Sequence, residues 1–136
     1  MAASDVKPAD TPAILALGEP MIEFNQSASD DARQFLQGFG GDTSNFCVAA
    51  ARQGASVGYV TRLGDDAFGK LFLDLWRAEG VDVQGVASDA QSHTGVYFVT
   101  HDASGHAFSY LRKDSAASRM SPQTLPRDLL AGTRFL

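Results

Sequence analysis

Two stretches of the 136-residue sequence carry side chains that suit the binding of a small polar ligand. The first is the segment 40–45, whose sequence is GGDTSN. Its two glycines let the backbone approach a ligand closely, and a helix that begins there would direct free N–H groups and its positive dipole end at the same point. Asn45, one turn into that helix, can both donate and accept hydrogen bonds. The segment suits a polyhydroxylated or anionic molecule, but a glycine turn before a capped helix explains the same residue types, with Asp42, Thr43 and Ser44 as candidate caps.

The second stretch is a predicted β-hairpin that carries two tyrosines and an arginine. Tyr110 and Arg112 are two residues apart, so they face the same side of a strand, and Tyr97 lies on the preceding strand. A phenol beside a guanidinium can bind hydroxyl groups and a carboxylate together, because arginine can hold a carboxylate with two parallel hydrogen bonds. A solvent-exposed hairpin face is the alternative explanation for these three residues.

The other reactive residue types indicate no second site. Cys47 is expected to be a buried small apolar side chain. Asp65-Asp66 has the composition of a metal pair, but Asp66 also suits the N-cap of a following helix, which we favour. No G-x-x-x-x-G-K-[ST] phosphate loop occurs, and Thr43 takes the place of the last glycine in a dinucleotide fingerprint. The histidines fit no metal-binding spacing and are expected at the surface. They are His93, His101 and His106.

The elements that must position these residues follow from hydrophobic periodicity and turn residues. The pattern predicts strands at 13–17, 21–24 and 57–61, helices at 43–53 and 67–79, and a hairpin from 94–100 and 107–112. Strands that alternate with helices favour a parallel α/β sheet. Phe135 and Leu136 are predicted to begin another buried strand. Because an unpaired apolar sheet edge is usually avoided, we expect the chain to be the N-terminal part of a longer polypeptide.

Composition excludes several classes of function. Hydrophobic residues make up 44% and charged residues 20%, which is typical of a folded globular chain. A net charge of −5 argues against nucleic-acid binding and against a polybasic membrane surface. No apolar run approaches the roughly 20 residues of a membrane span. Residues 1–12 are expected to be a flexible tail, and the single cysteine excludes an internal disulfide and fits a cytoplasmic location.

Two segments together resemble the first signature of the ribokinase-like (pfkB) carbohydrate kinases. They are residues 40–54, GGDTSNFCVAAARQG, and residues 64–69, GDDAFG. Three further segments are similar to the 2-keto-3-deoxygluconate kinase branch of that family. They are GEPMIEF at 18–24, TGVY at 94–97 and YLRKDSAAS at 110–118. The resemblance covers nearly all of the chain from Ala13 onward, but only the N-terminal portion of the family's longer sequence.

The resemblance implies a partial Rossmann-like ribokinase fold of the α/β class. It comprises residues 13–136, with a small β-sheet lid formed by about 21–38 and 94–112. In this family the lid and the glycine-rich segment hold the sugar. The implied substrate contacts in this sequence are Gly41, Asn45, Tyr97, Tyr110 and Arg112. Glu23 stands where some relatives place a hydroxyl-binding acid.

The implied activity is ATP- and Mg²⁺-dependent phosphorylation of 2-keto-3-deoxygluconate, a small sugar acid, to its 6-phosphate. The family's catalytic base, ATP pocket and Mg²⁺ motif lie in a C-terminal half beyond this sequence, so no catalytic residue is assigned here and the chain alone is expected to be inactive. Homo-oligomerisation through the lid strands is also implied. Two alternatives remain: a kinase of the fructokinase or ribokinase type, and a non-catalytic fragment that acts as a sugar-binding or dimerisation module.

Overall fold

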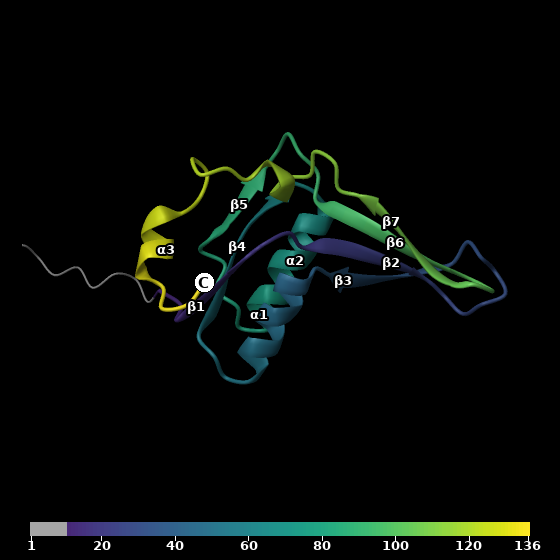
Figure 1. Ribbon diagram of the computed structural model, residues 1–136, viewed down its shortest axis with the longest axis horizontal. Helices are drawn as coiled ribbons and strands as arrows, with labels where there is room; N and C mark the ends of the chain where they lie inside the picture. Colours follow the sequence, from purple (N-terminus) through teal and green to yellow (C-terminus); the bar gives the residue numbers. More distant parts are fainter. Residues whose placement is uncertain (1–10) are drawn as a thin grey trace, which may run out of the picture.

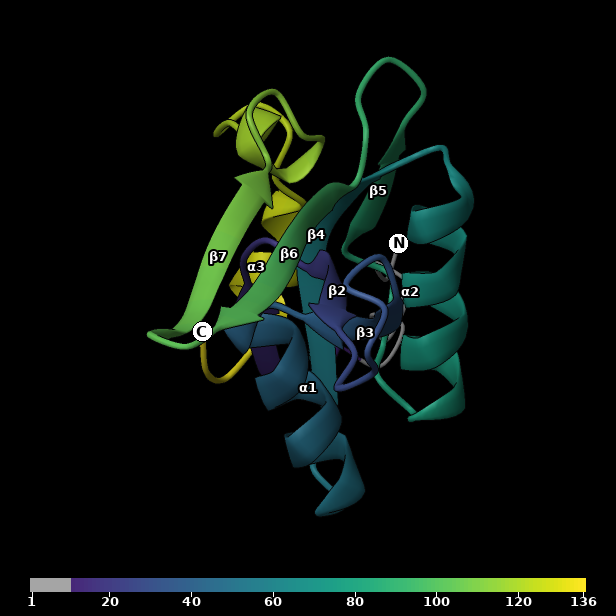
Figure 2. The same ribbon diagram turned by 90° about the vertical axis from the view of Figure 1, so that its right-hand side faces the viewer.

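The computed structural model describes residues 11–136 and contains two sheets that meet near the start of the first helix. The parallel sheet has the order β1-β4-β5, and the mixed sheet has the order β3-β2-β6-β7. The mixed sheet projects away from the parallel sheet (Figure 1), and Figure 2 shows its four strands from β7 at one edge to β3 at the other. The expected α/β class is therefore confirmed, including a separate small sheet.

The parallel sheet has a long, largely buried central strand, β4, between two strands of four residues each. Their bounds are β1 Ile14–Leu17, β4 Val57–Gly64 and β5 Val86–Asp89. The strands of the mixed sheet are β2 Met21–Gln26, β3 Phe35–Gly40, β6 Gly95–Asp102 and β7 Gly105–Leu111. Strand β2 pairs in parallel with β6, while β3 and β7 pair antiparallel with β2 and β6. The predicted hairpin is β6–β7, and the segments expected to form a lid supply the four strands of the mixed sheet, although β3 extends two residues past the expected bound at 38.

The helices are α1 (Asp42–Arg52), α2 (Ala67–Ala78), α3 (Arg127–Gly132) and a short 3₁₀ turn η1 (Ala117–Arg119). The N-cap of α2 is Asp66, as predicted, and its carboxylate accepts from the Gly69 N–H at 2.8 Å. The N-cap of α1 is Gly41, which makes no side-chain cap. The candidate caps in α1 were therefore wrong, because the two hydroxyl side chains among them are used in the core.

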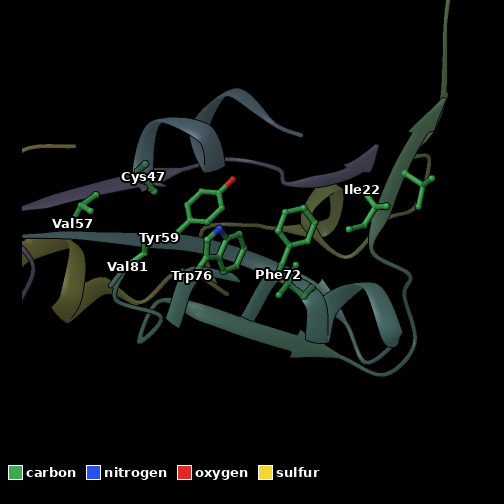
Figure 3. Close-up of a cluster of buried hydrophobic side chains, with 10 residues drawn as sticks. Ile22, Cys47, Val57, Tyr59, Phe72, Trp76 and Val81 are labelled. Carbon is green, nitrogen blue, oxygen red and sulfur yellow. The ribbon is translucent and has the colours of Figure 1, made fainter. Parts of the chain in front are cut away.

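Aromatic side chains between the parallel sheet and the two helices form the centre of the core (Figure 3). Tyr59 of β4 and Trp76 of α2 pack edge to face with ring centroids 4.7 Å apart. The Trp76 indole N–H donates to Ser44 Oγ at 2.9 Å, and the Tyr59 and Thr43 hydroxyls are 2.6 Å apart. Burial raises the pKa of Tyr59, so its hydroxyl stays protonated at neutral pH. These contacts fix the start of α1 against both β4 and α2.

Cys47 and the two ends of the chain were also covered by predictions. Cys47 is fully buried, as expected, and burial raises the pKa of its thiol to about 11. Phe135 pairs with β1, since its carbonyl accepts from Leu15 N–H at 2.9 Å, but it is 56% exposed and so is not the buried residue expected. The expected tail 1–12 falls mostly outside the described residues, although Pro12 is buried and its carbonyl accepts from the Thr133 hydroxyl. Among residues 11–136, none of the helices has both the length and the apolar character needed to cross a bilayer.

Asp66 and His93 join the mixed sheet to the rest of the fold. The Asp66 carboxylate accepts from the Thr94 N–H at 2.8 Å and from the Thr94 hydroxyl at 2.9 Å. Burial alone would raise the pKa of Asp66, but these hydrogen bonds and that from Gly69 outweigh it and the pKa is lowered. His93 joins the start of β6 to the segment that follows β7, because its Nδ1 lies 2.9 Å from the Thr94 carbonyl oxygen and its Nε2 lies 3.1 Å from that of Lys113.

Replacing His93 with glutamine is expected to destabilise the protein more at acidic than at alkaline pH. A protonated imidazole donates to both carbonyls and a neutral one to only one, so the Thr94 and Lys113 oxygens raise the pKa of His93. A raised pKa gives stability that is complete below the ordinary value of about 6.5 and is lost as the pH rises through the folded-state value. Urea unfolding at pH 5.5 and 8.5 measures the difference, with His106→Gln in the exposed hairpin end as the control. A His93→Gln effect that is equal at both pH values would contradict this role.

Candidate functional site

A cavity of about 540 Å³ lies where the two sheets meet. Its walls come from the β1–β2 turn, the start of α1 and the β6–β7 hairpin. The lining residues are Gly18, Glu19, Met21, Gly41, Asp42, Thr43, Tyr97, Phe108, Tyr110 and Arg112. The β1–β2 turn follows the carboxyl end of a parallel strand, which is the edge at which open α/β sheets bind ligands.

Four of the five predicted site residues share this cavity. Gly41, Tyr97, Tyr110 and Arg112 all line it, although 71 positions separate Gly41 from Arg112 in the sequence. The structure thus supports the prediction that the glycine segment and the hairpin face one ligand-sized space. Tyr97 is buried, whereas Tyr110 and Arg112 are each 53% exposed, so the β7 side of this hairpin face is open to solvent, as the alternative expected.

Asn45 does not line the cavity. It is exposed and lies beside a separate hollow of about 340 Å³ formed with Phe39, Val48 and Leu75, among others. The inner face of α1 is set by Ser44 and Cys47, which are buried in the core. Successive helix residues are rotated by about 100°, so Asn45 lies about 100° from Ser44 and points away from that buried face. The prediction of a contact between Asn45 and the same ligand is therefore not supported by this geometry.

Gly41 forms the sharp turn between β3 and α1. Its φ is +99°, in the region that side chains with a Cβ rarely adopt. A Cβ at this position would lie 2.7 Å from the carbonyl oxygen of Glu19 and 3.0 Å from Pro20 Cα. The absence of a side chain therefore lets the β1–β2 turn pack directly on the start of α1. This contact places two walls of the cavity side by side.

The hairpin supplies an aromatic wall. Tyr97 lies opposite Tyr110 in the β6–β7 register, with ring centroids 5.7 Å apart, and Phe108 stacks beside Tyr110 at 6.1 Å. The Tyr97 hydroxyl donates to the carboxylate of Glu23 on β2. Burial and this carboxylate both raise the pKa of Tyr97, so the phenol remains a neutral donor. Glu23 itself does not line the cavity; it acts on the site through Tyr97.

Arg112 is paired with an acid that the sequence analysis did not identify as a site residue. Its Nη2 lies 2.5 Å from Oε2 of Glu19, and the Glu19 Oε1 accepts from the Ser115 hydroxyl at 2.6 Å. The side chain of Glu19 is only 10% exposed, whereas that of Arg112 is 53% exposed. A signal for Glu19 was available, because an acid in the turn after a parallel strand lies at the ligand-binding edge of such a sheet.

The cavity carries mixed charge. Arg112 contributes one positive charge, while Glu19 and Asp42 contribute one negative charge each. With two tyrosine hydroxyls and the peptide groups at the start of α1, these groups can make many hydrogen bonds to a polyhydroxylated molecule. Within residues 11–136, no three histidine, cysteine or acidic side chains gather as a possible metal cluster.

Comparisons with known proteins agree with this architecture. Residues 12–136 match the profile of the pfkB family carbohydrate kinases. The chain is 36% identical over 124 residues to a 2-dehydro-3-deoxygluconokinase from Thermoproteus tenax, covering 87% of the chain and 38% of the relative. It is 32% identical over 126 residues to fructokinase-2 from Solanum lycopersicum, covering 89% of the chain and 38% of the relative.

A solved structure shows the same fold. The crystal structure of a fructokinase from Xylella fastidiosa with bound ATP superposes with a TM-score of 0.78 at 30% identity, covering 85% of this chain and 37% of that one. The chain therefore spans about two fifths of the length of these relatives. On the family match across residues 12–136, the chain belongs to the pfkB family of carbohydrate kinases.

Proposed function

We propose that this chain forms the sugar-binding part of an ATP-dependent kinase that phosphorylates 2-keto-3-deoxygluconate. In the reaction, a bond forms between the 6-hydroxyl oxygen of the sugar and the γ-phosphorus of ATP, the bond from that phosphorus to the leaving oxygen of ADP breaks, and the hydroxyl proton passes to a carboxylate base. The residues of this chain bind and orient the sugar. The catalytic base, ATP and Mg²⁺ are assigned to none of them, because the resemblance to the pfkB kinases places those parts in the C-terminal half of the family's sequence.

The observation that carries the proposal is a half-exposed arginine at the edge of a cavity rich in hydroxyl groups. Nη2 of Arg112 is engaged by Glu19, and its other N–H groups have no acceptor among residues 11–136. A sugar acid supplies both a carboxylate for these N–H groups and several hydroxyls for the tyrosines. The T. tenax relative, which is named a 2-dehydro-3-deoxygluconokinase, supports the same substrate class.

Each wall of the cavity has a distinct task in this proposal. The backbone at Gly41 approaches the sugar without a side chain between them, and Tyr110 and Tyr97 provide hydroxyl groups and apolar ring faces. Arg112 binds the carboxylate end. A sugar held at its acidic end by the hairpin directs its opposite, hydroxyl-bearing end away from Arg112, as transfer to the 6-position requires.

A neutral ketose such as fructose is the second candidate substrate. The charges of Arg112, Glu19 and Asp42 sum to −1, which disfavours an anionic ligand unless Arg112 pairs with it directly. The 32% identity to a tomato fructokinase supports this candidate. Of the two substrates, only the acidic sugar has a carboxylate that Arg112 would recognise.

Thermal stabilisation by the two sugars tests the proposal. The melting temperature of the chain is expected to rise by roughly 5–10 °C with 2-keto-3-deoxygluconate at about 100 times its Kd, because a ligand that binds only the native state adds about 2.7 kcal/mol at that concentration. Fructose at the same concentration is expected to give a much smaller rise. An equal or larger rise with fructose would favour the neutral sugar, and no rise with either would contradict sugar binding by this chain.

A further inference from the structure

We propose that Glu19 is a positioning residue that determines the preference for an acidic sugar. It holds the guanidinium of Arg112 at the cavity edge so that the remaining N–H groups of Arg112 meet the ligand's carboxylate. This inference rests on the proposed function, because it concerns how the same site selects its substrate. The inference is based on two differences within the ion pair: Glu19 is more buried than Arg112, and among residues 11–136 only the Glu19 side chain is held by a further hydrogen bond.

Glu19 is the fixed partner. Its carboxylate is held from behind by the hydroxyl of Ser115, which is itself fully buried. Gly95 leaves the space that the carboxylate occupies, since a Cβ on Gly95 would lie 2.8 Å from Glu19 Oε1. The carboxylate therefore cannot swing into the cavity without losing its hydrogen bond to Ser115. It is a stationary negative charge beneath the arginine.

Arg112 is the partner that keeps free binding capacity. The ion pair uses its Nη2 alone, the side chain is 53% exposed, and Arg112 lines the cavity. A guanidinium has five N–H donors in a planar fork, so a contact at one nitrogen leaves others for a second carboxylate. The geometry fits an arginine shared between a buried protein acid and a ligand acid.

Each charge of the ion pair stabilises the position of the other side chain. Oε2 of Glu19 is buried and accepts no hydrogen bond from residues 11–136, so the charge of Arg112 is its compensation there. A negative charge under the guanidinium draws Arg112 toward the cavity wall and limits its rotamers. Without that charge, the long side chain is free to turn into solvent, and its ordering becomes a cost of ligand binding.

Substitution of Glu19 by glutamine tells whether Glu19 positions Arg112 for the ligand or competes with the ligand for it. If Glu19 positions Arg112, Glu19→Gln is expected to weaken the binding of 2-keto-3-deoxygluconate by roughly tenfold and to change fructose binding by no more than about twofold. If Glu19 instead competes with the ligand for Arg112, the same variant binds the acidic sugar more tightly. Isothermal titration calorimetry with both sugars measures the two affinities, and an unchanged or tighter binding of the acidic sugar overturns the inference.

The matched control is Glu79→Gln. Glu79 pairs with Arg52 at 2.5 Å, and neither residue lines the cavity. The Glu79→Gln variant therefore loses an ion pair of the same kind away from the site, and its affinities for both sugars are expected to stay unchanged. A second readout needs no ligand: ¹⁵N relaxation of the Arg112 Nε–H group is expected to show greater mobility in Glu19→Gln than in the wild type. Equal mobility overturns the inference. A wild type that binds neither sugar contradicts the proposed function, while the relaxation measurement still decides whether Glu19 fixes Arg112.

Discussion

Arg112→Ala is expected to weaken the binding of 2-keto-3-deoxygluconate by roughly 10- to 100-fold, with little effect on the binding of fructose. The alanine removes the charge-assisted hydrogen bonds to the carboxylate, which are worth about 1.5–3 kcal/mol. In the complete enzyme the same change is expected to raise KM for the acidic sugar strongly. Calorimetric titration of the chain and steady-state kinetics of the complete enzyme measure these effects. An unchanged Kd and KM would remove Arg112 from the site.

Two further variants, a double variant and Arg33→Ala, distinguish a loss of sugar binding from a loss of stability. Arg112→Ala leaves the Glu19 carboxylate without its compensating charge, which is expected to destabilise the fold by roughly 1–2 kcal/mol. The double variant with Glu19→Gln removes both charges, so it is expected to recover most of that stability without recovering binding of the acid. Arg33→Ala is the control for charge alone, because Arg33 is 89% exposed in a pair with Asp31 remote from the cavity.

The parts of the site that could be predicted from sequence depend on local geometry. Strand alternation places Tyr110 and Arg112 on one face whatever the rest of the fold does, and the structure confirms that both line the cavity. The N-cap at Asp66 was predictable for the same reason, since a cap needs only the next few residues. The burial of Cys47 followed from its apolar neighbours on α1.

The parts that could not be predicted depend on contacts between distant residues. The spacing of Asn45 from the glycines does not determine how α1 is rotated about its axis. That rotation is set by the hydrogen bond between Ser44 and Trp76, which are 32 positions apart. That bond also takes Ser44 from its expected role as a cap. The role of Glu19 follows from Arg112 and Ser115, which the fold brings to it across more than 90 positions. Sequence patterns of local period carry no information on such pairs.

Gly41→Ala is expected to lower the free energy of unfolding by roughly 3 kcal/mol and to reduce sugar binding as well. Two separate effects add: a φ of +99° is strained for alanine by about 1 kcal/mol or more, and the new Cβ meets backbone atoms of Glu19 and Pro20 that have no room to move. Relief of that contact pushes the β1–β2 turn away from α1. Because the turn carries Glu19, the shift also disturbs the partner of Arg112.

Gly54→Ala is the matched control because it isolates the backbone effect. Gly54 has a φ of +83°, and a Cβ there would meet nothing within 4 Å, so the expected loss is only about 1 kcal/mol with unchanged sugar binding. Urea unfolding of both variants and titration with 2-keto-3-deoxygluconate give the comparison. Equal destabilisation by the two substitutions would mean that the close approach at Gly41 costs nothing. The glycine would then serve the turn alone, and the packing of the β1–β2 turn on α1 would not be what holds the two cavity walls together.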